Sequence, residues 1–97
     1  MHLEIITPEK KIYSGEVDMV NLPGTDGFFG LLENHAPIIS TLKQGPIKIL
    51  QKVGGKNDFN SETGQLIHST KNDKELTFEV KGGVVEMNNN KVIVLAE

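Results

Sequence analysis

The apolar residues of this chain recur at every second position, in short runs that end at turn-forming residues. In the clearest run Leu76, Phe78 and Val80 alternate with charged or hydroxyl-bearing neighbours, and Leu3 and Ile5 follow the same rule near the N-terminus. A period of two places apolar side chains on one face of a β-strand, whereas a helix needs a period of about 3.6. The pattern therefore predicts strands that bury one face and leave the other in water.

Strong turn signals separate these runs. The segment 23–27 is Pro-Gly-Thr-Asp-Gly, Gly45 and Pro46 precede a further run, and Asn fills positions 88–90. Glycine supplies positive φ angles, and Asn and Asp bond to nearby backbone groups, so each of these segments favours a turn. Many short strands separated by turns at intervals of about 8–12 residues indicate an all-β sandwich or barrel.

Two segments depart from this alternation. Residues 92–95 are apolar at every position, which predicts a strand inside a sheet that is covered on both faces. Residues 31–43 are the best candidate for a helix, but Pro37 interrupts them. Because proline removes a helical hydrogen bond, we expect at most one helical turn there and no long helix in the chain.

The stretch around residues 54–74 is the most polar part of the chain and is rich in Gly, Asn and Ser. We expect a long hairpin or loop insertion there, with Phe59, Leu66 and Ile67 as candidate anchors and with amides that exchange quickly. A length of 97 residues suits one domain and not two. The chain is therefore expected to form a single domain over residues 1–97 around one thin core.

Charge and composition exclude several kinds of function. The net charge is −3 and both signs are mixed along the chain, so a nucleic acid is not an expected partner. No apolar run approaches the ~20 residues of a membrane-spanning helix, and the N-terminus lacks the basic segment of a signal peptide. Any membrane contact is therefore expected only through partners. The absence of Cys rules out disulfides and thiolate metal sites.

The densest cluster of unusual residues spans positions 27–37, directly after the strongest turn. Phe29 and Leu31 are expected to be core residues, since most Phe side chains of a small domain are buried. Phe28 cannot share a face with Phe29 in an extended chain, so we expect Phe28 to be the more exposed of the two. An exposed aromatic side chain at a corner is a candidate binding anchor.

Glu33 and His35 are the most tempting catalytic pair, but the pattern does not support catalysis. No Ser, Cys or second ligand stands beside them, and His2 and His68 have no metal-ligand spacing. His35 is expected to fix its loop through hydrogen bonds or to lie in an interface. Gly82-Gly83 lacks the Lys-Ser/Thr of a phosphate-binding loop. We therefore expect no catalytic residue, no cofactor and no metal site.

Taken in order, several segments resemble the N-terminal domain of the epsilon subunit of F-type ATP synthases, which is called delta in mitochondria. The resemblance covers residues 3–52 and 80–96, and its specificity lies in the ordered set. It is carried by Ile6-Thr7-Pro8, by Tyr13-Ser14-Gly15-Glu16-Val17, by the run from Leu22 to Leu32 with Asn34-His35-Ala36-Pro37, and by Gly82-Gly83-Val84-Val85-Glu86 with residues 90–96.

The resemblance implies a fold and a role. The fold is a two-sheet antiparallel β-sandwich of about ten strands. The role is that of a non-catalytic central-stalk subunit, which couples the gamma subunit to the proteolipid ring of a proton-translocating ATP synthase, peripherally at the cytoplasmic face of the bacterial plasma membrane. By position, Gly27, Phe28 and Gly30 would face the ring, and Thr7 and His35 would face gamma.

Two departures from the family pattern qualify that expectation. The stretch 53–75 is longer than the family's corresponding hairpin, and Glu97 directly follows the last strand. The family commonly continues into two helices, so we expect here no inhibitory helical arm and no ATP binding. The alternative is a free-standing β-sandwich that binds a sugar or peptide, although four Phe, one Tyr and no Trp supply few stacking platforms. Co-purification with gamma would separate the two.

Overall fold

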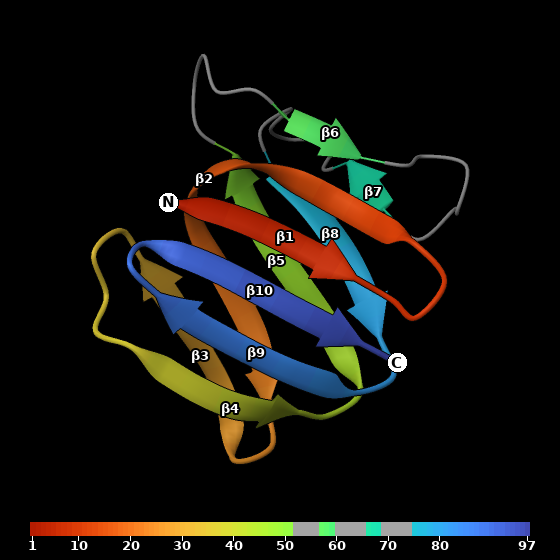
Figure 1. Cartoon of the computed structure of the whole chain (residues 1–97). Coiled ribbons are helices and arrows are strands. Elements are labelled where there is room, and N and C mark those ends of the chain that lie inside the picture. Colours follow the sequence, from red (N-terminus) through yellow and green to blue (C-terminus); the bar gives the residue numbers. More distant parts are fainter. Residues whose placement is uncertain (52–56, 60–65, 69–74) are drawn as a thin grey trace.

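The computed structural model describes residues 1–51, 57–59, 66–68 and 75–97, all of them strands and the turns between them (Figure 1). In chain order the strands are β1 (His2–Ile6), β2 (Lys11–Gly24), β3 (Gly27–Leu32), β4 (Ile38–Leu42), β5 (Gly45–Gln51), β6 (Asn57–Phe59), β7 (Leu66–His68), β8 (Glu75–Val80), β9 (Gly83–Asn88) and β10 (Lys91–Ala96). Within the described residues no helix is long and apolar enough to cross a membrane.

The strands form two facing layers that share the long strand β2. Hydrogen-bonded neighbours follow the order β1-β10-β9-β4-β2-β5-β8-β7, with β3 and β6 paired to β2. The first half of β2 pairs with β1, and its second half pairs with β3 and β5. Figure 1 shows β1, β10, β9 and β4 in front of β3, β5 and β8. The predicted all-β sandwich is confirmed.

One pairing differs from an antiparallel sandwich. β1 runs parallel to β10, with Leu3 opposite Val92 and Ile5 opposite Val94. The other strand pairs of the described residues are antiparallel. Parallel neighbours cannot be joined by a tight hairpin, but these two strands lie at opposite ends of the chain and need no direct connection. The first and last strands of the chain are thus hydrogen-bonded neighbours in one layer.

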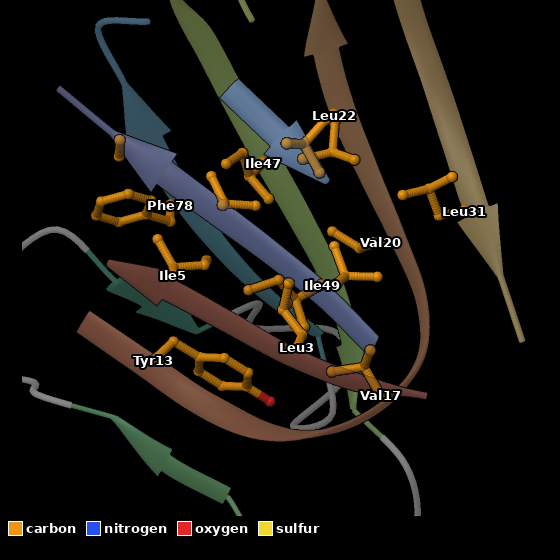
Figure 2. Close-up of a cluster of buried hydrophobic side chains, with 14 of the residues drawn as sticks. Leu3, Ile5, Tyr13, Val17, Val20, Leu22, Leu31, Ile47, Ile49 and Phe78 are labelled. Carbon is orange, nitrogen blue, oxygen red and sulfur yellow. The ribbon is translucent and has the colours of Figure 1, made fainter. Parts of the chain in front are cut away.

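The core lies between the two layers and follows the alternation of the sequence. Leu3 and Ile5 of β1 face Ile47 and Ile49 of β5 and Phe78 of β8 across the interior (Figure 2). Each of these side chains is inaccessible to solvent or nearly so. The rest of the buried apolar set is Met1, Ile12, Tyr13, Val17, Val20, Leu22, Leu31, Leu42, Leu76, Val80, Val85, Met87, Val92, Val94 and Ala96.

The expectation that residues 92–95 are covered on both faces is wrong. Val92 and Val94 are buried, whereas the side chain of Leu95 is 55% exposed. β10 is indeed an inner strand, because β1 pairs with one of its edges and β9 with the other. Pairing of both edges leaves the outer face of a strand open, however, and in this layer no described element lies over it.

Residues 31–43 contain no helical turn. They form the end of β3, a turn at Glu33 and Asn34, and then β4. Asn34 adopts a positive φ of 64°, a conformation that Asn tolerates better than most residues. Pro37 stands directly before β4, where a missing backbone N–H costs no ladder hydrogen bond.

The expected insertion at 54–74 contains two short strands with different neighbours. β6 pairs with β2, with Asn57 opposite Gly15, and β7 pairs with β8, with Leu66 opposite Phe78. The predicted fast amide exchange, and the anchoring by the side chains of Phe59, Leu66 and Ile67, concern features that lie outside the part of the chain that the structure describes.

Candidate functional site

The hairpin that joins β2 to β3 carries one of the two surfaces singled out here. Its turn is Thr25-Asp26, and Gly24 pairs with Gly27 on either side of it. We call Gly27, Phe28 and Gly30 the hairpin tip. The Phe28 ring is 57% exposed, as predicted, and Gly30 is exposed. The tip therefore presents an exposed aromatic ring, with Gly27 before it in the chain and Gly30 two residues after it.

Phe29 points to the opposite side of β3, but it is only partly buried against the core. Phe29 therefore packs against the core, as predicted, but is not fully buried in it. Leu31 is fully buried, as expected. The ring of Phe29 lies over Gly24, where an added Cβ would stand 2.7 Å from its Cε1 atom. A larger residue at position 24 would displace the ring, so Gly24 sets the orientation of Phe29.

The outer side of the β1-β10-β9-β4 layer carries the second surface. Ile6 stands opposite Leu95, and Leu95 opposite Val84. In the neighbouring row Ile93 stands opposite Glu86, and Glu86 opposite Ile39. We call Ile6, Ile39, Val84, Ile93 and Leu95 the outer apolar face. Ile39 is 72% exposed and Val84 38% exposed. Ile6, Leu95 and Val84 adjoin across three strands, while Glu86 separates Ile39 from Ile93. An apolar surface of this kind is a candidate interaction site.

A shallow groove adjoins this face at its β4 border. Its volume is about 440 Å³, and its lining residues are Pro37, Ile38, Ile39, Glu86, Met87 and Asn88. The Glu86 carboxylate makes no side-chain hydrogen bond or ion pair within the described residues. An unpaired carboxylate beside apolar side chains suits a partner that offers a cation together with an apolar surface.

Charged residues border the outer apolar face on the β1 side. The Glu4 carboxylate lies 3.4 Å from His2 Nε2 and 3.6 Å from Lys11 Nζ. Burial alone would raise the pKa of Glu4, but the hydrogen bond with His2 and the charges of Lys11 and Lys91 outweigh burial and lower it. Glu4 therefore stays ionised at neutral pH.

The structure places Thr7 and His35 at opposite ends of the same layer and does not bring them together. Thr7 directly follows Ile6, and its hydroxyl oxygen accepts the Lys10 N–H at 3.3 Å and donates to the Lys10 carbonyl at 3.1 Å. His35 lies in the loop before β4. Its backbone N–H donates to the Leu32 carbonyl at 3.1 Å, and its Nδ1 lies 2.7 Å from the Ala36 carbonyl. The outer apolar face lies between these two loops.

His35 thus holds its own loop, which is one of the two roles expected of it. Glu33 Oε1 lies 3.0 Å from the amino group of Met1. Within the described residues, no group of three or more His, Cys, Asp or Glu side chains could hold a metal ion. The geometry offers contact surfaces and shows no assembled catalytic centre in the described part of the chain.

Sequence reasoning proposed the hairpin tip as a candidate contact but did not propose the exposed residues Ile39, Val84 and Leu95. A signal for Val84 and Leu95 was present, because Val84-Val85 and residues 92–95 are apolar at consecutive positions. By its composition alone, the second run predicts a strand with two covered faces. The same pattern also describes a strand with one face in the core and one face available to a partner.

Comparisons with known proteins place this sandwich in a family. The model of the ATP synthase delta/epsilon chain β-sandwich domain matches residues 1–64. The ATP synthase epsilon chain of Caulobacter vibrioides is 35% identical over 97 residues, which cover the whole of this chain and 90% of that protein. The chain belongs to the delta/epsilon chain family of ATP synthases, as the sequence resemblance indicated.

Other relatives are longer than this chain. The epsilon chain of Brevibacillus brevis is 34% identical and that of Nitratidesulfovibrio vulgaris 38% identical, and 97 residues cover 59% and 58% of those proteins. The chain thus spans about three fifths of their length. A solved structure of the central stalk and c-ring of the Tetrahymena thermophila mitochondrial ATP synthase matches with a TM-score of 0.58 at 14% identity, covering 99% of this chain and 62% of the other. That likeness concerns the fold alone.

Proposed function

We propose that this chain is a non-catalytic central-stalk subunit of a proton-translocating F-type ATP synthase, and that it couples the gamma subunit to the proteolipid ring. The observation that carries the proposal is the outer apolar face. Ile39 and Leu95 are largely exposed although the core between the layers is complete without them. Their exposure is explained if another subunit covers them.

The two surfaces suit two different partners. The outer apolar face belongs to the β1-β10-β9-β4 layer and lies between the loops of Thr7 and His35. We assign this face to gamma. The hairpin tip belongs to the other layer, and we assign Gly27, Phe28 and Gly30 to the ring. Because β2 runs through both layers, a load on the tip passes directly into the layer that holds gamma.

Transmission of torque requires a stiff body. The interior of a sandwich is close-packed, so its layers cannot slide past each other without breaking side-chain contacts. We infer that residues 1–97 act as one rigid domain that carries an insertion at about 54–74. The chemistry of ATP synthesis then belongs to other subunits. The assembled position is peripheral, at the cytoplasmic face of the bacterial plasma membrane, with membrane contact only through partners.

The assignment of the outer apolar face is tested by co-purification with the gamma subunit. We expect the wild-type chain to bind gamma and the Ile39→Glu variant to bind at least about tenfold more weakly, because the variant buries a charge in an apolar contact. Lys48→Glu is the matched control, since it places a carboxylate on the exposed side of β5 in the other layer. If neither the wild type nor the control binds gamma, a free-standing binding module is the better account.

A further inference from the structure

The strand β3 pairs with another described strand on one side only, where it meets β2. The hydrogen bonds at the end of β2 show which backbone groups of β3 bond to β2 and which do not. The Pro23 carbonyl accepts the Lys43 N–H at 2.9 Å, and the Thr25 N–H donates to the Thr41 carbonyl at 3.1 Å. Both groups thus point toward β4, so the backbone of Gly24 points the other way, toward β3.

Backbone groups alternate in direction along an antiparallel strand. Since Gly27 of β3 pairs with Gly24, the backbone N–H and C=O groups of Gly27 point toward β2. Those of Phe29 and Leu31, two and four residues further on, point toward β2 as well. Phe28, Gly30 and Leu32 therefore direct their N–H and C=O groups to the free edge. Only the Leu32 carbonyl has a partner within the described backbone, because it accepts the His35 N–H.

The same three residues leave room for an added strand. The side chains of Phe28 and Leu32 are 57% and 58% exposed and flank Gly30. A Cβ at Gly30 would meet nothing closer than the Val20 carbonyl oxygen at 4.0 Å. Among the described residues, nothing covers this edge along its backbone or above its central residue.

Natural edge strands are protected by charged residues, by proline or by a bulge. The strand β3 is Gly-Phe-Phe-Gly-Leu-Leu, without charge or proline, and its register with β2 runs without a shift. An apolar edge without charge, proline or bulge favours pairing with a further strand.

We propose that the unassembled chain forms a dimer in which β3 pairs antiparallel with β3 of a second copy, around a two-fold axis at Gly30. The sequence is self-complementary in this register, because Phe28 stands opposite Leu32 of the other copy. The Gly30 N–H of each copy donates to the Gly30 carbonyl of the other, and the Leu32 N–H of each donates to the Phe28 carbonyl of the other. An isologous contact needs such a self-matching patch.

The dimer covers the hairpin tip, which the proposed function assigns to the ring. Dimer and assembled complex would then exclude each other, so the chain would shield its exposed Phe28 until it is assembled. This consequence rests on the proposed function, whereas the edge pairing itself does not. A failure to bind gamma would leave the dimer intact, and a monomeric chain would leave the gamma contact intact.

A cysteine at the two-fold axis tests the register. The chain contains no native Cys, so Gly30→Cys introduces a single thiol. Directly opposed residues of a bonded pair lie about 5.5 Å apart at Cα, within the span of a disulfide. We expect Gly30→Cys to form a disulfide-linked dimer on mild oxidation. Leu32→Cys alone should form little, because its copies lie about 13 Å apart at a rise of about 3.3 Å per residue. A mixture of the Leu32→Cys and Phe28→Cys variants should cross-link.

Sedimentation of the chain over a range of concentrations gives an independent measurement. We expect a concentration-dependent dimer whose dissociation constant rises about tenfold or more in Gly30→Pro, which removes an outward N–H, and little in Gly30→Ala, which keeps it. A wild-type chain that stays monomeric would overturn the proposal. So would a dimer that fails to cross-link through Gly30→Cys, or one that Ile39→Glu dissociates, since that dimer would use the outer apolar face.

Discussion

Two adjacent Phe residues in the hairpin lie in different environments, and alanine substitutions at the two positions should therefore differ in their effect on stability. Phe29 lies against the core over Gly24, whereas Phe28 lies mostly in solvent. We expect Phe29→Ala to lower the free energy of unfolding by roughly 1–3 kcal/mol, less than a fully buried Phe because the ring is only partly covered. Phe28→Ala should lower it by less than ~1 kcal/mol. Urea unfolding measures both, and equal losses would contradict the assignment.

Glu4 provides a test by pH. Its folded-state pKa lies below the ordinary value of 4.5, so the carboxylate contributes stability above that pH and the contribution is lost as the pH falls. We expect the unfolding free energy of the wild type to fall between about pH 5 and pH 3, and to fall less in Glu4→Gln. Thermal melts across this range measure the two slopes. Identical slopes would show that the contacts of Glu4 with His2 and Lys11 contribute nothing.

At the scale of a single strand, one face of β10 lies in the core and the other face carries part of the proposed gamma contact. Val94 is buried, whereas Leu95 belongs to the outer apolar face. We expect Val94→Ala to cost about 2 kcal/mol of stability with little effect on gamma binding, because it removes core atoms only. Leu95→Ala should cost less than ~1 kcal/mol and should weaken gamma binding. If Val94→Ala weakens gamma binding more than Leu95→Ala does, the assignment of the faces is wrong.

Strands and turns were predictable because each is a local property. The alternation in residues 75–80, the Gly-containing turns and the exposure of Phe28 over Phe29 all follow from neighbouring residues. Which faces of the strands meet is not local. The parallel pairing of β1 with β10, and the open face on which Leu95 lies, depend on residues far apart in sequence. For the same reason Ile39 could not be predicted as part of a surface, since Val84 and Leu95 come from other strands.

At the scale of the whole molecule, the two proposed contact surfaces lie on different layers of one sandwich. The outer apolar face crosses β1, β10, β9 and β4, and the hairpin tip lies on β3, while β2 pairs with strands of both layers. This arrangement suits a body that holds one partner on each side and turns with both. The role itself came from the family resemblance, because a strand pattern defines a sandwich but does not say what binds to it.

ATP-driven proton pumping tests the coupling role most directly. In inverted membrane vesicles that carry the complete ATP synthase containing this chain, pumping is measured relative to the ATP hydrolysed. We predict that removing the chain lowers the protons pumped per ATP and that adding it back restores them. Phe28→Asp and Ile39→Glu should each fail to restore pumping fully, while Lys48→Glu should succeed. Vesicles that pump equally well per ATP with and without the chain would contradict the account.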